Sequence, residues 1–543
     1  MPDTEPGASA PAELDAVVVG AGFAGLYMLH KLREQGLRAR VFEAGSQVGG
    51  TWFWNRYPGA RCDVESLDYS YSFSDELQQE WQWTERFPSQ PELLRYLNHV
   101  ADRFDLRRSI AFNTRVTAAT FLDDRDCWEV RTDGGEVLTC RFFISAVGCL
   151  SAANVPPIPG LDRFEGDWYH TGAWPHEGVD FTGKRVGLIG TGSTGIQATP
   201  PIAAQADHLH VFQRTPNYSI PARNRPLSGP EWEDIKAHYG EIRDKCRASW
   251  GGFPYERSEV SALAVSPEER EAKYQQLWSE EGGFKFLYGS YNDFLTNEAA
   301  NDTVAEFIRR KIHEIVKDAA VADTLSPRDY PYGTKRPPID TDYYETFNRA
   351  NVTLVDLRDT PIVEITPKGL RTSDREYELD TIVFATGFDA MTGSLLRIDI
   401  RGTDGVSLRD KWAHGPLTYL GVQIAGFPNL FVITGPGSPS VLTNMPLAIE
   451  QHVEWISDCI DHLRDRGLTR VEATEDAEAK WGEHVQEVAD ATLFPKTNSW
   501  YVGANIPGKS RVFMPYVGGF APYQQLCDDV AAKGYEGFVL SGR

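Results

Sequence analysis

Residues 16–25 read AVVVGAGFAG, an apolar strand that runs through a glycine-rich turn into the start of a helix. Each glycine answers a separate physical need in such a turn. Gly20 permits the tight bend, Gly22 lets the backbone approach a pyrophosphate, and Gly25 lets the helix pack close to the strand. The phosphates then lie at the positive N-terminus of the helix. The segment therefore predicts a Rossmann-like dinucleotide-binding domain of the α/β class.

The strand that follows this helix indicates which dinucleotide fits. It covers residues 39–42 and leads into Glu43, 18 residues beyond Gly25. A carboxylate at this place accepts hydrogen bonds from the hydroxyls of an unphosphorylated ribose. The first motif therefore predicts an FAD site. The alternative is a glycine turn in an α/β core that binds nothing.

A second motif of the same kind begins at residue 185, where the chain reads RVGLIGTGSTG. Its following strand ends in a base instead of an acid, because Arg214 lies 19 residues past Gly195. A guanidinium there can grip a 2′-phosphate through two parallel hydrogen bonds. This motif predicts NADPH in preference to NADH, and the alternative is a structural repeat with a vestigial site. The expected cofactor contacts are Gly190, Thr191, Gly192, Ser193, Thr194, Gly195 and Arg214.

Two loops have compositions that suit the same site. Residues 49–63 read GGTWFWNRYPGARCD, and such a loop can wrap a flat heterocycle. Asp63 at its end is a candidate for orienting a cation. In residues 332–338, Lys335 suits a second contact to the 2′-phosphate, and Arg336 suits a position facing the flavin. The alternatives are an ordinary packed loop and a solvated basic pair.

The order of the predicted elements gives the domain organisation. Residues 225–330 are charged, prone to form helices and poor in strand signals, so we expect a helical insertion there. Ser89 and Glu92 have the spacing of a capping box, and residues 376–384 read as a strand. The expected divisions are a disordered tail at 1–13, an FAD-binding domain at 14–150 and 387–543, an NADP-binding domain at 151–224 and 331–386, and a helical insertion within the NADP-binding domain at 225–330.

Overall composition limits the classes of function. Of the 543 residues, 41% are hydrophobic and 24% are charged, as in a soluble globular enzyme. The formal charge of -23 disfavours nucleic acid and acidic membrane surfaces, which both attract Lys and Arg. Apolar runs end well before the roughly 20 residues of a membrane span. We therefore expect neither a nucleic-acid nor a membrane partner.

The seven cysteines are scattered, and none belongs to a CxxC pair. This arrangement argues against a zinc site and against a dithiol redox centre. A disulfide reductase, which also combines FAD with NADPH, would need that pair. Their odd number and the lack of a signal peptide suggest reduced thiols. We expect a cytoplasmic protein without a metal site, as a monomer or a weak homo-oligomer.

Between the two glycine-rich motifs lies the dodecapeptide FEGDWYHTGAWP, at residues 164–175. It matches the pattern FxGxxxHxxxW(P/D), and residues 49–63 match GGxWxxxxYPGxxxD. With these two patterns and both dinucleotide motifs, the chain resembles the type I Baeyer–Villiger monooxygenases over nearly its whole length. The signature positions are Phe164, Gly166, His170, Trp174 and Pro175.

The resemblance implies roles for single residues. Arg336 resembles the family's essential arginine, and Asp63 resembles its carboxylate partner. His170 resembles a conformational linker, not a base that transfers protons. Pro446 departs from the family pattern, so the shape of the substrate pocket is not carried over. The further cofactor contacts are Gly20, Gly22, Phe23, Gly25, Glu43, Gly50, Thr51, Trp52, Arg61, Asp63, Tyr69, Val116, Arg214, Thr215, Lys335, Met445 and Trp500.

The resemblance also implies a reaction. NADPH reduces FAD, O2 adds to give a C4a-peroxyflavin, and this species attacks a ketone that rearranges to an ester or lactone. Residues 440–446 resemble the loop of members that accept aryl or bulky cyclic ketones, and sulfides are expected as further substrates. A flavin monooxygenase acting on N or S atoms is the main alternative, although Trp174 and Pro175 favour the ketone-oxidising branch. The more remote alternative is a non-catalytic sensor that binds FAD and NADP.

Overall fold

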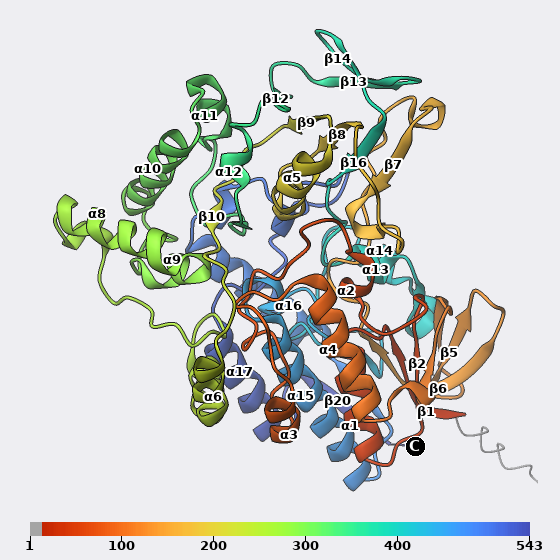
Figure 1. The fold of residues 1–543 in the computed structure, drawn as a ribbon. Helices are drawn as coiled ribbons and strands as arrows, with labels where there is room; N and C mark the ends of the chain where they lie inside the picture. The colour runs from red at the N-terminus through yellow and green to blue at the C-terminus, as the bar shows by residue number, and fades with distance from the viewer. Residues whose placement is uncertain (1–12, 543) are drawn as a thin grey trace, which may run out of the picture.

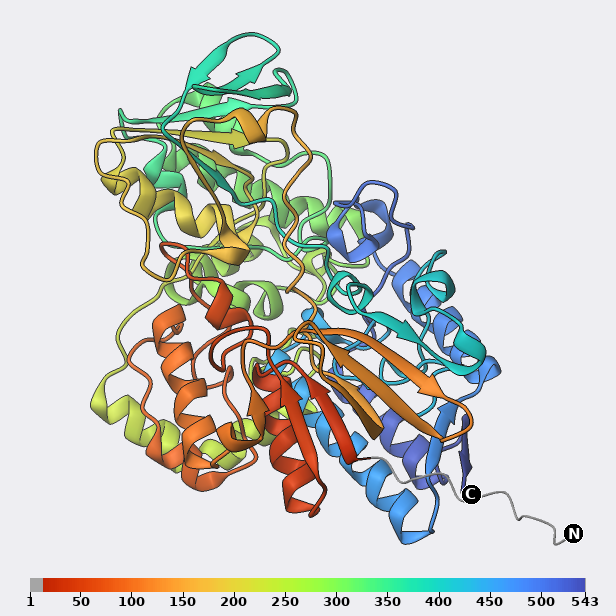
Figure 2. The same cartoon turned by 90° about the vertical axis from the view of Figure 1, so that its right-hand side faces the viewer.

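The computed structural model describes residues 13–542, so the tail expected at 1–13 lies, apart from Glu13, outside the described residues. The chain forms two α/β bodies, one above the other in Figures 1 and 2. Each body has its own main sheet. We call them the first body, which contains the N-terminal strand, and the second body, which contains residues 185–213.

The first body is built on an eight-stranded sheet in the order β17-β4-β5-β6-β1-β2-β3, with β18 paired to β6. Alternate residues of β1 enter two different cores: Ala16 and Val18 join one, and Val17 and Val19 join the other. Burial on both faces explains why this strand reads as a continuous apolar run. The strands are β1 (Leu14–Val19), β2 (Ala39–Phe42), β3 (Ile110–Ala111), β4 (Val116–Leu122), β5 (Cys127–Thr132), β6 (Val137–Ser145), β17 (Asp399–Arg401) and β18 (Leu430–Val432).

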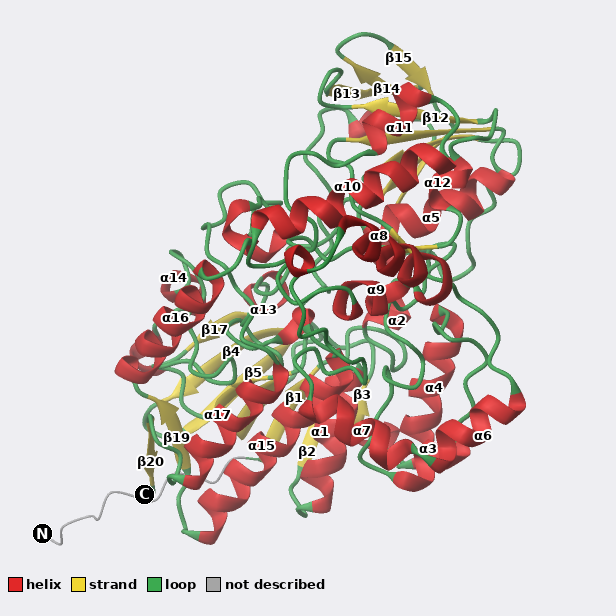
Figure 3. Cartoon of the chain, turned by 90° about the vertical axis from the view of Figure 1, so that its left-hand side faces the viewer, coloured by secondary structure: helices red, strands yellow, loops and turns green. Residues whose placement is uncertain are grey.

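Helices cover one face of this sheet, and Figure 3 shows α17, α15 and α1 next to one another. The long helix α15 brings the chain back to the first body and buries most of one flank in its core. Residues from the two ends of the sequence therefore share one core. The helices of this body are α1 (Phe23–Glu34), α2 (Thr51–Trp54), α3 (Asp75–Glu80), α4 (Gln90–Arg103), α13 (Gly393–Leu396), α14 (Leu408–Lys411), α15 (Met445–Asp465), α16 (Glu475–Asp490) and α17 (Phe520–Ala532), beside the strand pair β19 (Arg470–Ala473) and β20 (Phe538–Ser541).

The second body has a five-stranded parallel sheet in the order β12-β9-β8-β16-β7. The dodecapeptide supplies its edge strand β7, so this segment is part of the sheet and not a free linker. The elements are β7 (Asp167–His170), β8 (Arg185–Ile189), α5 (Ser193–Gln205), β9 (His208–Gln213), α12 (Tyr343–Thr346), β12 (Val352–Asp356) and β16 (Thr381–Phe384), with the short pair β10 (Ile220–Pro221) and β11 (Ile339–Asp340).

Two local expectations are wrong. Residues 376–384 form two strands: β15 (Glu376–Glu378) pairs with β14 (Gly369–Thr372), which also pairs with β13 (Ile362–Thr366), and β16 lies in the main sheet. The helix after Ser89 starts there as expected, but the Ser89 side chain caps no N–H group. Glu92 instead accepts a hydrogen bond from the N–H of Thr84 at 2.9 Å, so the capping box does not form.

Residues 225–330 form helices and no strand. They pack against both bodies, because Trp232 and Tyr239 join the first core whereas Tyr274 and Phe307 join the second. Helix α9 contributes to both cores and thus lies where the bodies meet. The helices are α6 (Gly229–Ala237), α7 (Tyr239–Ala248), α8 (Pro267–Gln276), α9 (Gly283–Gly289), α10 (Glu298–Ile315) and α11 (Ala319–Leu325).

Candidate active site

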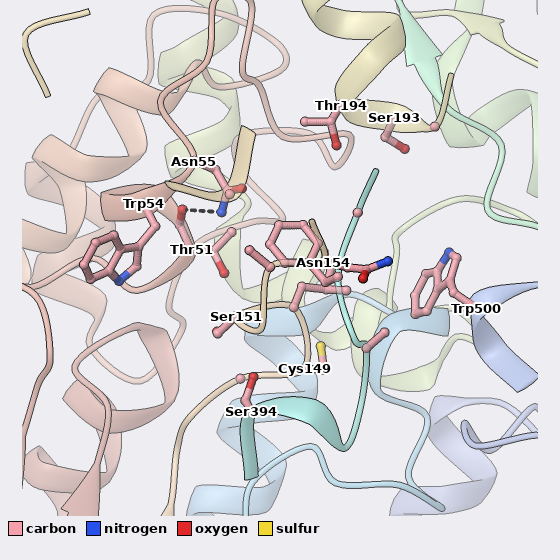
Figure 4. A pocket seen from close by; sticks show the side chains of 18 of the residues that line it. Thr51, Trp54, Asn55, Cys149, Ser151, Asn154, Ser193, Thr194, Ser394 and Trp500 are labelled. Atoms are coloured by element: carbon pink, nitrogen blue, oxygen red, sulfur yellow. Dashed lines mark hydrogen bonds between the residues drawn. The ribbon is translucent and has the colours of Figure 1, made fainter. Parts of the chain in front are cut away.

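A cavity of about 1030 Å³ lies where the two bodies face each other, and we call it the chamber. Both glycine-rich motifs open into it. Figure 4 shows its polar lining: Thr51 and Asn55 come from the first body, Ser193 and Thr194 from the second, and Trp500 from the C-terminal region. A single cavity therefore meets both predicted nucleotide sites.

The first motif forms the cradle that a dinucleotide needs. A side chain at Gly25 would lie 1.7 Å from the Gly20 carbonyl oxygen, so helix α1 can pack this close to the turn only with glycine. Glu43 is buried at the chamber wall, and its Oε2 accepts a hydrogen bond from the N–H of Ala21 at 2.8 Å. This bond holds the carboxylate beside the glycine turn, where a ribose hydroxyl can reach it.

The second motif repeats this geometry. A side chain at Gly195 would lie 2.1 Å from the Gly190 carbonyl oxygen, whereas one at Gly192 would meet no atom within 4 Å. Gly192 lines the chamber at the start of α5, so the open space before it suits a phosphate at a helix N-terminus. The fold thus offers two separate cradles for pyrophosphates.

Arg214 and Lys335 lie near each other in the chamber wall. Arg214 is exposed and lines the chamber, and Lys335 lines it too. The Lys335 Nζ lies 4.3 Å from the centroid of the Tyr330 ring. Burial lowers the pKa of Lys335 to about 8, and the charge of Arg214 adds to the lowering. The two positive charges repel each other, and an anion bound between them would relieve that repulsion. The pair therefore suits a site for a phosphate dianion.

Asp63 and Arg336, which are far apart in the sequence, form an ion pair at the chamber wall. Arg336 Nε donates to one Asp63 oxygen at 2.6 Å, and Nη2 donates to the other at 2.9 Å. Nη1 donates to the Val441 carbonyl at 2.7 Å, and the guanidinium lies 4.5 Å from the centroid of the Phe284 ring. Burial alone would lower the pKa of Arg336, but the Asp63 carboxylate raises it above its ordinary value. Arg336 is therefore a fixed, permanent cation.

Most of the predicted site residues lie at the chamber surface. Gly25 and Gly195 do not, since they pack each helix against its turn, and the five signature positions do not line the chamber either. The predicted residues that line the chamber are Gly20, Gly22, Phe23, Glu43, Gly50, Thr51, Trp52, Arg61, Asp63, Tyr69, Val116, Gly190, Thr191, Gly192, Ser193, Thr194, Arg214, Thr215, Lys335, Arg336, Met445 and Trp500.

The signature segment connects the two bodies. His170 is buried at the end of β7, and its Nδ1 accepts a hydrogen bond from the N–H of Gly172 at 3.0 Å. Burial lowers the pKa of His170, so its ring is neutral near pH 7. Further along, the N–H of Trp174 donates to the carbonyl of Trp54 in the first body at 3.3 Å. These contacts suit a mechanical link between the bodies and not a proton-transfer group.

The sequence does not predict a second link between the bodies, which Gln197 provides. Gln197 on α5 accepts a hydrogen bond from the Tyr57 hydroxyl at 2.8 Å and donates one to the Arg61 carbonyl at 3.1 Å. Gln197 lies two residues beyond the second glycine motif and lines the chamber. Its place near the start of the motif's helix is the only sequence signal that pointed to it. Asn154 and Ser394 also line the chamber without a sequence signal that we could use.

The segment that carries Trp500 is tied to the chain that leaves the second sheet. Asn505 donates to the Phe388 carbonyl at 2.7 Å, and Lys509 pairs with Asp389 at 2.6 Å. The Phe388 ring in turn packs edge-on against His170, with centroids 6.2 Å apart. The signature histidine and the Trp500 segment thus contact the same short stretch of chain.

Two kinds of feature are absent from residues 13–542. No helix in this part of the chain is long and apolar enough to cross a bilayer. The same residues hold no cluster of three or more side chains able to ligate a metal ion. All seven cysteines are buried.

Fold and chamber together define an α/β protein with two dinucleotide-binding motifs that face one cavity. A model of the flavin-binding monooxygenase-like family matches residues 15–223. The chain belongs to this family and, within it, to the type I Baeyer–Villiger monooxygenases, which confirms the family expected from the sequence.

Three relatives illustrate this membership. The structure of an oxidised steroid monooxygenase bound to NADP is 55% identical, with a TM-score of 0.93 over 98% of this chain and 100% of that chain. A Baeyer–Villiger monooxygenase from Pseudooceanicola batsensis is 47% identical over 530 residues, which are 97% of this chain and 96% of the relative. A phenazine N-monooxygenase from Lysobacter antibioticus is 44% identical over 528 residues, 97% of each chain.

Proposed function

We propose that the protein is a flavoprotein monooxygenase that uses FAD, NADPH and O2 to convert ketones to esters or lactones. The observation that carries the proposal is the Asp63–Arg336 pair in the wall of a chamber that both nucleotide cradles enter. When bound, the two cofactors supply the reducing electrons and activate dioxygen. The protein supplies binding, orientation and a fixed positive charge.

The two cradles divide the cofactors between the bodies. Glu43 suits the unphosphorylated ribose of FAD, so FAD is assigned to the first body. Arg214 and Lys335 suit the 2′-phosphate of NADPH, so NADPH is assigned to the second body. Residues 14–150 and 387–543 then form the FAD-binding domain, and residues 151–224 and 331–386 form the NADP-binding domain. The insertion at 225–330 supports both, because its helices enter both cores.

Arg336 is assigned the central catalytic role. Three of its N–H groups bond to Asp63 and Val441, which leaves two of its five for reactants. Such a preorganised cation stabilises negative charge on an oxygen as a carbonyl carbon becomes tetrahedral, and it does so most strongly where water is excluded. Asp63 is assigned to hold the guanidinium in that orientation. His170 is assigned to link the bodies, and Trp500 to contact the nicotinamide side of the chamber.

Aryl or bulky cyclic ketones are the proposed substrates, with sulfides as further ones. The site of action is proposed to be the cytoplasm, where buried thiols stay reduced, and the protein is proposed to act as a monomer or a weak homo-oligomer. O2 and the ketone are the reaction partners.

Oxidation of a ring nitrogen is a second candidate function. The phenazine N-monooxygenase is similar over nearly the whole chain, so family membership alone does not separate the two activities. Phenazine and the ketones therefore belong in the same assay.

A panel of substrates tests the proposal. Linear, aryl, small cyclic and steroidal ketones, a sulfide and phenazine would each be incubated with the holoenzyme, NADPH and O2. We expect ketone-dependent consumption of NADPH and a product that is heavier by one oxygen atom in the mass spectrum, fastest for aryl or bulky cyclic ketones. If only phenazine gains oxygen, the protein is an N-monooxygenase and the proposed ketone oxidation is wrong. If no substrate gains oxygen, the proposed monooxygenase function is wrong.

A further inference from the structure

A second, much smaller cavity lies beside Arg336. Its volume is about 50 Å³, and Arg336 lines both this cavity and the chamber. We call it the side cavity. Seven of its fifteen lining residues are aromatic, and the wall comes from the helical insertion and from the segments around Arg336, Leu442 and Tyr501. A group in the side cavity would therefore lie next to the cation to which we assign the central role.

Tyr288 from helix α9 carries a hydroxyl group in this wall. Its ring is held by neighbours: the centroids of Phe253 and Trp250 lie 5.4 and 6.1 Å away, and a side chain at Gly251 would press on it. The position of the phenol is therefore fixed by packing. Burial raises the pKa of Tyr288 to about 12, although Arg336 and Arg257 act to lower it. Its hydroxyl stays protonated and can donate a hydrogen bond at working pH.

The Tyr288 hydroxyl has no hydrogen-bond partner among residues 13–542. It is also not sealed in the interior, unlike the hydroxyls of Tyr332 and Tyr343, which are buried without a partner. The Tyr288 hydroxyl is thus a donor beside Arg336 that the protein itself leaves unused. A polar group placed at an apolar cavity in this way fixes the orientation of a ligand.

We propose that Tyr288 is a specificity-determining residue, which donates a hydrogen bond to an oxygen atom carried by one arm of the ketone. The claim rests on the proposed function, because it assumes that the reacting carbonyl lies at Arg336. It adds the substrate class: a ketone with a short, oxygen-bearing arm on one side of its carbonyl group.

The size of the side cavity limits that arm. A cavity of about 150 Å³ in another protein accepts benzene, so about a third of that volume takes two or three heavy atoms. A hydroxymethyl group fits this limit, and a phenyl ring does not. The bulky part of the ketone must therefore lie in the chamber, and the short arm in the side cavity.

A matched pair of ketones tests the proposal. Hydroxymethyl phenyl ketone and ethyl phenyl ketone differ by a hydroxyl in place of a methyl group. In the Tyr288→Phe holoenzyme we expect kcat/KM for the hydroxymethyl ketone to fall about fivefold to tenfold, the usual effect of one lost hydrogen bond. For the ethyl ketone we expect a change of less than about twofold, because the ring remains.

Tyr291→Phe is the control variant. Tyr291 lines the same cavity, but the charges that act on its phenol are those of Glu269 and Arg270 and not that of Arg336. We expect this variant to keep the parental ratio between the two ketones. A second readout is independent of turnover: calorimetric binding of the hydroxymethyl ketone to the oxidised protein with FAD and NADP+ should weaken about fivefold to tenfold in Tyr288→Phe only.

The outcomes separate the two claims. If the parent oxygenates both ketones and Tyr288→Phe changes both rates and the binding equally, the role of Tyr288 is refuted and the proposed function stands. If the parent oxygenates neither ketone nor any other in the panel, the proposed function fails. The calorimetric comparison then still decides whether Tyr288 binds the hydroxyl group.

Discussion

Arg336 contacts two parts of the chain that are both far from it in the sequence. Its bonds to Asp63 and to the Val441 carbonyl span 273 and 105 residues. The family resemblance led to the pairing with Asp63. The contact with Val441 had no sequence signal, because any residue offers a backbone carbonyl. At this scale the sequence predicts the chemical groups, and the fold alone decides which of them meet.

Lys335 makes a prediction about pH. Its pKa of about 8 in the free protein means that it loses its charge as the pH rises past that value. Since only the charged form attracts the 2′-phosphate, the Michaelis constant for NADPH should rise several-fold between about pH 7.5 and about pH 9.5. NADH lacks this phosphate, so its Michaelis constant should stay flat over the same interval.

Steady-state kinetics with both cofactors would check this, with Lys335→Arg as the matched variant. An arginine stays charged throughout the interval, so the dependence for NADPH should disappear in that variant. A parental enzyme whose constants for NADPH and NADH rise together would remove Lys335 from the phosphate site.

At the scale of elements, both glycine turns follow from the sequence because their constraint is local. The same glycines divide into two kinds, which the structure separates. Gly195 has a carbonyl oxygen 2.1 Å from where its side chain would be, and Gly192 has open space. Gly195 allows the helix to pack closely against the turn, and Gly192 leaves space for the ligand.

Alanine at these two positions should therefore have opposite effects. Gly195→Ala should lower the free energy of unfolding by about 3 kcal/mol or more, because backbone must shift to relieve the clash. Gly192→Ala should leave that free energy within about 0.5 kcal/mol and raise the Michaelis constant for NADPH about tenfold or more. Chemical denaturation and NADPH kinetics on both variants would show this; a stable Gly195→Ala or an unaffected cofactor constant in Gly192→Ala would contradict it.

Elements whose ends depend on distant partners were less predictable. The strand pattern at residues 376–384 is interrupted because Asp380 bonds to Arg185 of β8, 195 residues away. The Ser89 capping box fails because Glu92 has a competing donor in Thr84. In both cases the local pattern is sound, and a tertiary contact overrides it.

At the scale of the whole molecule, contacts between the bodies create the site. Tyr57 with Gln197, and Trp174 with Trp54, hold the cradles against each other, and Asp63 with Arg336 closes the wall. The sequence indicated both cradles but not their distance. It also could not show that the helical insertion enters both cores, because amphipathic spacing identifies a buried face and not its partner.

The most direct test of the account is Arg336→Ala, assayed twice with one preparation. We expect NADPH to reduce the bound flavin at close to the parental rate, because the cradle for NADPH is intact. Ester formation from a ketone should fall by a factor of about 100 to 1000, since one preorganised electrostatic contact is lost. Arg336→Lys should recover little, because an ammonium cannot reproduce the paired bonds to Asp63. If Arg336→Ala makes ester at the parental rate, the assignment of this cation, and the mechanism built on it, is wrong.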